Sequence, residues 1–230
     1  MTMRPRLLPL VLTALALPAL VGAGKCGIIY DTSSLQLVLE PVSVVDVESD
    51  GGGLEVFAFD RNGIVVWFYL YGYDASLDDV GFEVVDDTLD VFMLKAGPAE
   101  VTADFYLEIP LGTELTLAVD DGPVKLTGVD APISGTVLAG DVEGVHLATT
   151  DVDLEVSGAA TLELLARPVT LRVTADTGDI AITVPAGAYR CDLEADKEPV
   201  LKDITCDAAA DAELILAAPA GEIRIEGTTP

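Results

Sequence analysis

Three adjacent pairs of aspartates are the residues of this sequence whose type and spacing could do chemistry: Asp78-Asp79, Asp86-Asp87 and Asp120-Asp121. Clustered acids hydrolyse glycosidic bonds, and β-helix polysaccharide hydrolases use them in this way. Successive residues of a strand face opposite ways, so an adjacent pair does not by itself converge on one substrate. Aspartate is also a common turn residue. We therefore expect solvated turn acids, and a carbohydrate-active β-helix enzyme is the less favoured alternative.

Nucleophilic catalysis has little support in the sequence. His146 is the only histidine, and it lies in an alternating segment in which we expect its ring to face solvent. A catalytic triad needs a base held beside a nucleophile, and there is no Gly-x-Ser-x-Gly elbow. Zinc sites need clustered cysteine and histidine, which the sequence lacks. We predict no catalytic residue, no metal ligand and no cofactor, and hence a protein that is not an enzyme.

Calcium binding is a second alternative function. Acidic β-rolls hold this cation with several oxygen ligands between neighbouring coils. Asp151 and Asp153 would share one face of a strand, and Asp120 and Asp121 could lie on a neighbouring coil. The sequence has no Gly-Gly-x-Gly-x-Asp repeat. A calcium-stabilised acidic β-roll is therefore kept as a hypothesis.

The three cysteines indicate an oxidising compartment. Cys191 and Cys206 are close in sequence and are expected to form a disulfide, with two buried free thiols as the alternative. Cys26 is then left over. It follows Ala23-Gly24-Lys25, which is similar to a bacterial lipobox, although Lys25 stands where a small residue is expected. Cys26 is therefore a candidate lipidation site, and a freely secreted protein is the alternative.

An aromatic cluster surrounds the only tryptophan, Trp67, in the apolar run from Ile64 to Tyr71, and Tyr73 follows it. The cluster could be a stacking platform for sugar or an apolar docking strip. It could equally be a strand buried on both faces, whose rings fill the core. We expect the buried strand, because the sequence shows no polar residues converging on the rings.

The elements that must position these residues are short strands. Apolar and polar residues alternate with period two, which gives each strand one buried face and one solvated face. The short segments that carry this pattern follow turn residues. They include Gly122-Pro123-Val124-Lys125-Leu126, Gly140-Asp141-Val142-Glu143, Asp151 to Val156, Gly178-Asp179-Ile180-Ala181-Ile182 and Gly221-Glu222-Ile223-Arg224-Ile225. Such strands bury their apolar faces by stacking on neighbours. We predict an all-β, right-handed parallel β-helix or similar β-solenoid with two strands per coil, and an antiparallel β-sandwich as the alternative.

Two local signals predict how particular strands end. Arg61-Asn62-Gly63 is typical of a hairpin turn between Leu54–Phe59 and Ile64–Leu70. The C-terminal Glu226-Gly227-Thr228-Thr229-Pro230 combines charge, glycine and proline, which suits a protected edge strand.

The N-terminal segment predicts export. Arg4 and Arg6 precede an apolar stretch from Leu7 to Val21, and small residues follow it, as in a secretory signal peptide. We expect residues 1–25 to be this signal peptide, cleaved or processed as in a lipoprotein. Residues 26–41 would form a lead-in and residues 42–230 a single solenoid domain. Without the first 25 residues the chain has nine basic and 39 acidic residues, and such a polyanion repels nucleic acid.

The turn motifs resemble those of the bacterial DUF4097 family, whose members are labelled "putative adhesin". The residues that carry the resemblance are Ile109-Pro110-Leu111-Gly112, Gly122 to Val129, Thr177 to Ile182 and Ala220 to Gly227. The Ser-Gly-Asp turn of that family is replaced here by Asp121-Gly122-Pro123, Arg167-Pro168 and Glu198-Pro199. The resemblance implies a β-solenoid protein of the cell envelope with no established chemistry.

From export, strand pattern and this resemblance we expect a non-enzymatic scaffold or adhesin-like protein. It would be periplasmic, anchored at the outer membrane or extracellular. Its partner would be an unidentified envelope or surface component, with a possible lipid anchor to the membrane and no nucleic acid.

Overall fold

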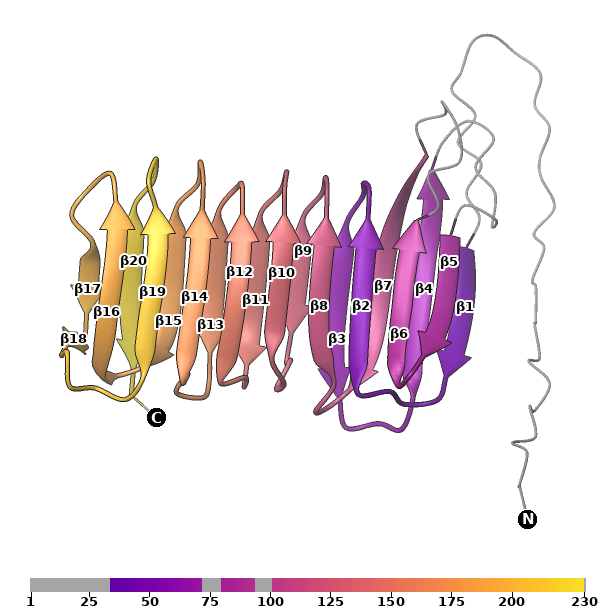
Figure 1. Ribbon diagram of the computed structural model, residues 1–230, viewed down its shortest axis with the longest axis horizontal. Coiled ribbons are helices and arrows are strands. Elements are labelled where there is room, and N and C mark those ends of the chain that lie inside the picture. The colour runs from indigo at the N-terminus through magenta and orange to yellow at the C-terminus, as the bar shows by residue number, and fades with distance from the viewer. Residues whose placement is uncertain (1–33, 72–79, 94–100, 230) are drawn as a thin grey trace, which may run out of the picture.

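The computed structural model describes residues 34–71, 80–93 and 101–229, and all its regular elements within these ranges are β-strands. They form two sheets of ten strands each. Figure 1 shows the sheets face to face, one in front of the other, along a single elongated body. This arrangement lets both sheets turn their apolar faces toward one shared core.

The two sheets, here called sheet A and sheet B, have the following spatial order. Sheet A contains β1 (Ser34–Leu39), β4 (Ile64–Tyr71), β7 (Thr102–Pro110), β3 (Leu54–Phe59), β9 (Val124–Thr127), β11 (Val142–Leu147), β13 (Ala160–Leu164), β15 (Ile180–Pro185), β20 (Ile223–Thr228) and β17 (Val200–Lys202). Sheet B contains β18 (Ile204–Cys206), β16 (Gly187–Ala195), β19 (Glu213–Ala218), β14 (Thr170–Ala175), β12 (Asp151–Val156), β10 (Ile133–Val137), β8 (Glu114–Val119), β2 (Val44–Ser49), β6 (Thr88–Met93) and β5 (Val80–Val85).

The chain winds as a solenoid. From β8 to β15 it alternates between sheet B and sheet A, so each coil contributes one strand to each sheet. Strands of successive coils pair in parallel, and among the pairings described only β1 with β4, β4 with β7 and β5 with β6 are antiparallel. The prediction of a parallel β-solenoid with two strands per coil is confirmed, and the antiparallel sandwich is not what forms.

Because the parallel strands pair in register, equivalent apolar residues of successive coils lie on top of one another in columns. One column of sheet A has at most 1 % exposure in each member: Leu54, Val124, Val142, Ala160, Ile180 and Ile223. Its counterpart in sheet B is Val45, Leu115, Ile133, Val152, Leu171 and Leu214. The period-two alternation of each strand thus becomes one continuous core between the sheets.

The Gly-Asp motifs and Gly122 lie at the turns that lead from sheet B to sheet A, and successive coils approach one another closely there. A Cβ atom on Gly122, whose φ is +135°, would lie 1.9 Å from the carbonyl oxygen of Gly52 in the adjacent coil. The following aspartates connect the coils, because Asp141 accepts a 2.8 Å hydrogen bond from the amide of Ala159. Asp179 accepts an equivalent bond of 2.8 Å from the amide of Glu222. Glycine therefore permits the close approach, and aspartate satisfies a backbone donor of the next coil.

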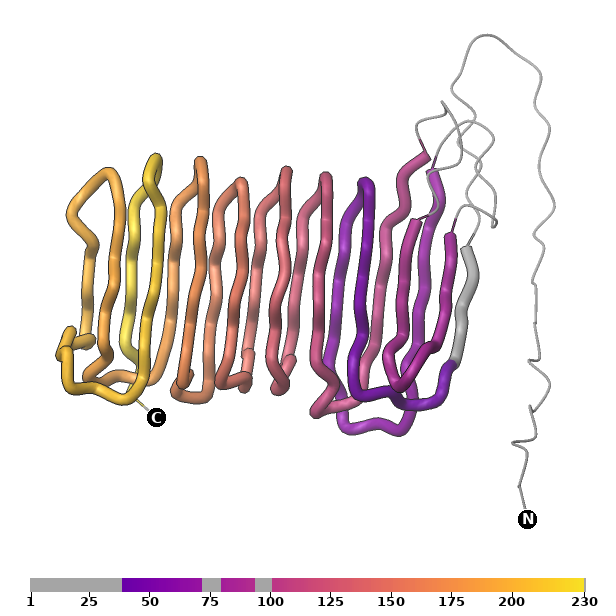
Figure 2. The backbone as a smooth tube through the Cα atoms, in the orientation of Figure 1, coloured from indigo at the N-terminus to yellow at the C-terminus, as the bar shows by residue number. Residues whose placement is uncertain are grey.

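At both ends of the solenoid the coils do not follow sequence order. The coil of β19 and β20 lies between the coil of β14 and β15 and the terminal strands β16 and β17. Figures 1 and 2 show this as yellow strands between orange ones. The coil of β2 and β3 likewise lies between β6 and β7 on one side and β8 and β9 on the other.

This order corrects two predictions. The hairpin expected at Arg61-Asn62-Gly63 does not form, because β7 lies between β3 and β4 and pairs with both. The C-terminal segment is not an edge either, because β20 pairs with β15 and with β17. In the first case the later strand β7 lies between β3 and β4, and in the second the earlier strand β17 pairs with the other side of β20.

The predicted signal peptide and Cys26 lie outside the described residues, so they stay predictions. The end of the expected lead-in, residues 26–41, contains β1, which pairs with β4 at the edge of sheet A.

Candidate functional site

The most distinctive surface of the described chain is a set of aromatic side chains on the outer face of sheet A. These residues, here called the aromatic strip, are Phe57 and Phe59 of β3, Tyr106 of β7, and Trp67, Tyr69 and Tyr71 of β4. The three strands are neighbours, with β7 in the middle. Phe59 is 44 % exposed and Tyr69 is 47 % exposed, and the other four rings are half-buried. Large rings gathered on an outward face are candidates for binding.

The rings contact one another across the strands. The ring of Tyr106 stacks on that of Phe57 with a centroid distance of 4.8 Å. On its other side it meets the Trp67 ring edge-on at 5.0 Å. Phe57 and Phe59 lie parallel on the same strand at 6.2 Å. The contacts join four rings from three strands into one surface, and each ring limits the rotamers of its neighbours.

Carboxylates lie in register beside these rings. Along the cross-strand rows, Tyr106 has Glu55 as its partner on β3, and Phe57 has Glu108 on β7. Tyr69 has Asp104 on β7. Three rows of the strip therefore pair an aromatic ring with an acidic side chain, whereas Phe59 has Pro110 and Tyr71 has Thr102 as its partner on β7.

Two of the acidic side chains, Glu108 and Asp104, are themselves oriented by local contacts. Arg61, in the turn after β3, forms an ion pair with Glu108. Asp104 accepts a 2.7 Å hydrogen bond from the amide of Gly53. Burial, followed by the negative charge of Asp104, raises the pKa of the Tyr71 hydroxyl above its usual value of 10.0. Tyr71 is consequently a neutral hydrogen-bonding group at physiological pH.

The expectation that the aromatic strand is buried on both faces is wrong. Alternate residues of β4 face opposite ways, so Phe68 lies in the core, 1 % exposed, and contacts Phe82 and Phe105. Trp67 and Tyr69 face outward. The inner face of β4 is buried in the core throughout, whereas on the outer face Val65 is buried, Trp67 and Tyr71 are half-buried and Tyr69 is exposed. Tyr73, the last ring of the sequence cluster, lies outside the described residues.

Sequence reasoning missed three members of the strip: Phe57, Phe59 and Tyr106. Alternation within Leu54–Phe59 and Thr102–Pro110 places them opposite the buried Val56 and Leu107, which is a usable signal for outward rings. No local pattern shows that β7 lies between β3 and β4, and this neighbour relation brings the rings together.

The aspartate pairs that the structure describes do not converge. Asp86 and Asp87 form the tip of the β5–β6 hairpin with positive φ values of 47° and 70°. The backbone oxygen of Asp87 accepts from Ser43 and Val44, at the start of β2, whereas the amide of Asp120 donates to Ser49, at its end. Six strand residues separate the two pairs by about 20 Å. Asp78-Asp79 lies outside the described residues.

His146 faces solvent, as predicted. It lies at a bulge in β11 with a φ of 55°, and its side chain is 62 % exposed. Its Nε2 atom is 3.8 Å from the Oε2 atom of Glu163 on β13. No nucleophile is described beside it, so the contact is an exposed cross-strand pair, which contributes little to stability.

The carboxylates considered for calcium are also dispersed. Asp151 and Asp153 share the outer face of β12, but Asp153 is paired with Arg172 of β14 at 3.2 Å. Asp120 and Asp121 lie beyond β8, and β10 separates β8 from β12, so they are not on the neighbouring coil. Across residues 34–71, 80–93 and 101–229 there is no group of three or more His, Cys, Asp or Glu side chains placed to hold a metal ion.

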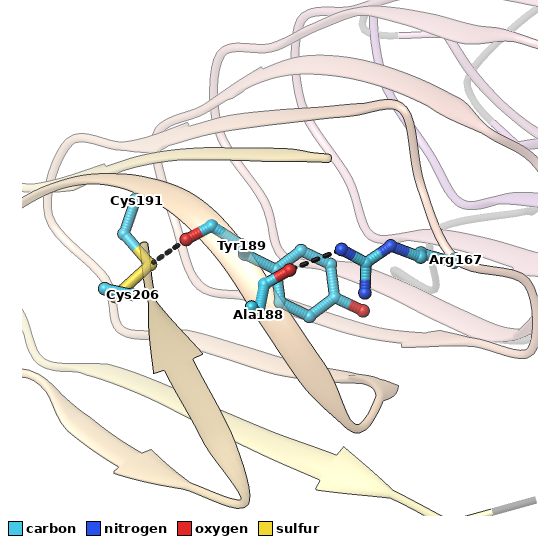
Figure 3. The surroundings of a disulfide bond; sticks show 5 residues. All are labelled: Arg167, Ala188, Tyr189, Cys191 and Cys206. Carbon is cyan, nitrogen blue, oxygen red and sulfur yellow. Dashed lines mark hydrogen bonds between the residues drawn. A yellow bond between two sulfur atoms is a disulfide. The ribbon is translucent and has the colours of Figure 1, made fainter. Parts of the chain in front are cut away.

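The two C-terminal cysteines tie together the end of the solenoid. Cys191 of β16 and Cys206 of β18 are joined in a disulfide with a Cα–Cα distance of 5.4 Å. Beside it the buried Tyr189 donates a 2.6 Å hydrogen bond to the carbonyl of Pro185. The Arg167 guanidinium lies 4.3 Å from the centre of the Tyr189 ring and donates to the carbonyl of Ala188 (Figure 3). These contacts fix β16 and β18 as a cap.

The described segments include no helix that is long and apolar enough to cross a membrane.

Comparison with known proteins gives structural likenesses only. No family model and no curated protein matches the sequence, so the resemblance to the DUF4097 family stays a prediction. A solved structure of a "putative cell adhesion protein" from Clostridium sporogenes is 11 % identical, with a TM-score of 0.46 over 86 % of this chain and 100 % of that one. A "putative adhesin" from Bacteroides fragilis is 12 % identical, with a TM-score of 0.46 over 86 % and 97 %. A "putative lipid binding protein" from Parabacteroides distasonis is 13 % identical, with a TM-score of 0.39 over 85 % and 96 %.

Proposed function

We propose that this chain is an exported, non-enzymatic, adhesin-like scaffold of the cell envelope, which attaches to an envelope or surface component through the aromatic strip. The observation that carries the proposal is the outward placement of six aromatic side chains on three adjacent strands of a rigid sheet. A sheet face stacked in register offers a fixed surface without a conformational change. Such a surface suits attachment, whereas catalysis requires converging groups.

The remaining features of the chain agree with an extracytoplasmic scaffold. The disulfide between Cys191 and Cys206 suits an oxidising compartment. The net charge of −27 keeps an exposed, elongated protein soluble and disfavours association with anionic polymers. The N-terminal segment would direct export, and Cys26, if lipidated, would hold the scaffold at a membrane.

Co-sedimentation with isolated cell envelopes tests this proposal. The full chain should pellet with envelopes, and Tyr69→Ala should release it into the supernatant. Tyr69 is 47 % exposed, so the substitution should leave the fold intact. The matched control is Leu138→Ala, which removes a 62 % exposed apolar side chain in the turn after β10, outside the strip. Equal pelleting of all three proteins, or of none, would contradict attachment through the strip.

The alternatives give different results with the same protein. A glycosidase would release reducing ends from polysaccharides, and Asp→Asn changes at the aspartate pairs would abolish that release. A calcium-stabilised β-roll would melt at a lower temperature in EDTA. We expect no reducing ends and no shift of the melting temperature.

A further inference from the structure

The arrangement of the aromatic strip specifies the chemistry of its ligand. In three successive rows a ring lies beside a carboxylate: Tyr106 beside Glu55, Phe57 beside Glu108, and Tyr69 beside Asp104. The ring presents an apolar face, and the carboxylate accepts hydrogen bonds, with about four lone-pair sites on its two oxygens. A ligand that matches this surface needs flat apolar faces edged by hydrogen-bond donors.

We propose that the aromatic strip binds an uncharged polysaccharide, whose sugar rings stack on the aromatic side chains while their hydroxyl groups donate to Glu55, Asp104 and Glu108. This inference rests on the proposed attachment function and names its ligand class. A sugar ring has an apolar C–H face and a rim of hydroxyl groups, which is the pattern that the rows repeat. Because the strip crosses three strands, a polymer with several consecutive sugar units can contact more than one of its rings.

Charge selects an uncharged polymer over an anionic one. Among the described residues, the charged groups that border the rings are Glu55, Asp104 and Glu108, with Arg61 paired with Glu108 and Lys125 of β9 in register beside Glu55. The chain as a whole carries a net charge of −27. This net negative field would repel a polyanionic glycan or an anionic lipid surface, and the described cations beside the strip, Arg61 and Lys125, each already face a carboxylate.

Charge also disfavours a second copy of this chain as the occupant. Face-to-face pairing of two strips would oppose Glu55, Asp104 and Glu108 of one copy to the same residues of the other. Like charges placed opposite each other across an interface oppose association. The hydroxyl groups of a glycan instead supply donors for these carboxylates.

The single tryptophan of the chain makes occupancy of the strip directly measurable. Trp67 contacts Tyr106 within the strip and is the only tryptophan. Its fluorescence is to be titrated with dextran, galactomannan and a soluble β-glucan as uncharged probes, and with alginate as a polyanionic probe. We expect a saturable change with at least one uncharged polymer and none with alginate.

Two variants test which side chains bind. Tyr69→Ala and Phe59→Ala remove rings that are 47 % and 44 % exposed, and both keep Trp67 as the reporter. Each should weaken binding of the active polymer about tenfold or more, as loss of an aromatic anchor does. Leu138→Ala should bind as the unaltered chain does. Unchanged affinity in both strip variants would overturn the assignment, provided that their melting curves show a folded protein.

The failure of this inference can be told apart from that of the proposed function. If envelopes retain the chain through Tyr69 but no uncharged polymer changes Trp67 fluorescence, attachment stands and the ligand is not an uncharged glycan. If sedimentation equilibrium shows a dimer that Tyr69→Ala dissociates, the strip pairs with a second copy and the glycan assignment is wrong. If envelopes do not retain the chain at all, the proposed function itself fails.

Discussion

Substitution of Gly122 by alanine should destabilise the solenoid by separating two of its coils. Gly122 lies in the turn between β8 and β9, with a φ of +135°, and its missing Cβ would be 1.9 Å from the oxygen of Gly52. Ordinary contacts between heavy atoms begin near 3.5 Å. The added methyl group can be accommodated only if the two turns move apart by more than 1 Å.

The cost has two parts. A non-glycine residue at this φ costs about 1–3 kcal/mol of backbone strain. Separation of the turns would also weaken the hydrogen bonds between these two coils, among them the 2.8 Å bond from the amide of Asp120 to the carbonyl of Ser49 and the 2.9 Å bond from the amide of Leu54 to the carbonyl of Pro123. Each such bond contributes about 0.5–1.5 kcal/mol. We therefore expect Gly122→Ala to lower the free energy of unfolding by about 2–6 kcal/mol in total.

Gly112→Ala is the matched control. Gly112 also has a positive φ, +80°, but no atom lies within 4 Å of its Cβ position. It should cost only the backbone strain of about 1–3 kcal/mol. In thermal melts each kcal/mol corresponds to about 2–4 °C for a chain of this size, so Gly122→Ala should melt several degrees below Gly112→Ala. Equal melting temperatures would refute the idea that close stacking of the coils explains the glycine.

Three further predictions concern the cap and the charged surface. Replacing both Cys191 and Cys206 by serine should destabilise the cap by about 3 kcal/mol, the value for so short a loop, and hydrogen exchange should then be faster in β16 and β18 than in β12. Burial and the nearby Asp90 raise the pKa of Asp46 in the folded protein above its ordinary value of 3.8, so the ionised carboxylate opposes folding above the raised pKa. Asp46→Asn should therefore raise the free energy of unfolding at pH 7 and should have little effect below pH 3.8, where Asp46 is protonated in both states. Hydrogen bonds from Lys197 and Arg224 lower the pKa of Glu222 from 4.5 to about 2. The stability that ionised Glu222 gives the folded protein is therefore present above pH 4.5 and is lost as the pH falls toward 2. Glu222→Gln should make the free energy of unfolding from urea curves less dependent on pH in this range, and an unchanged pH dependence would contradict the prediction.

Much of the coil structure could be predicted because it is encoded locally. In Asp151–Val156 the alternation of polar and apolar residues is reproduced as strict alternation of exposed and buried side chains. The turn residues of Gly178-Asp179 likewise mark a real turn, and the structure adds their physical reason: glycine allows the close approach, and the aspartate accepts from Glu222 of the next coil.

The order of the coils at the two ends could not be predicted in this way. β16 and β19 carry similar alternating patterns, and nothing within either strand says which of them pairs with β14. In the structure β19 pairs with β14, and the turn after β19 brings Gly221 against Gly178. A Cβ atom on Gly221 would lie 2.1 Å from the carbonyl oxygen of Gly178. Matching of Gly-Glu to Gly-Asp turns is a signal that could have shown it.

The candidate site depended on the same missing information. Trp67 and Tyr69 could be identified as outward or inward only once β4 was known to have one covered face. The convergence of Phe57, Tyr106 and Trp67 follows from β7 lying between β3 and β4. The alternation pattern within one strand cannot show which rings meet when the order of the strands in the sheet, and not closeness in sequence, brings them together.

Acrylamide quenching of Trp67 fluorescence is the most direct test of the central claim that the outer face of sheet A is the attachment surface. It is to be measured on the free protein and on the protein bound to cell envelopes. We expect acrylamide to quench the half-buried Trp67 in the free protein and to quench it much less in the bound state, because the envelope component covers the strip. Equal quenching in the two states, with the protein demonstrably bound, would show that attachment occurs elsewhere on the molecule.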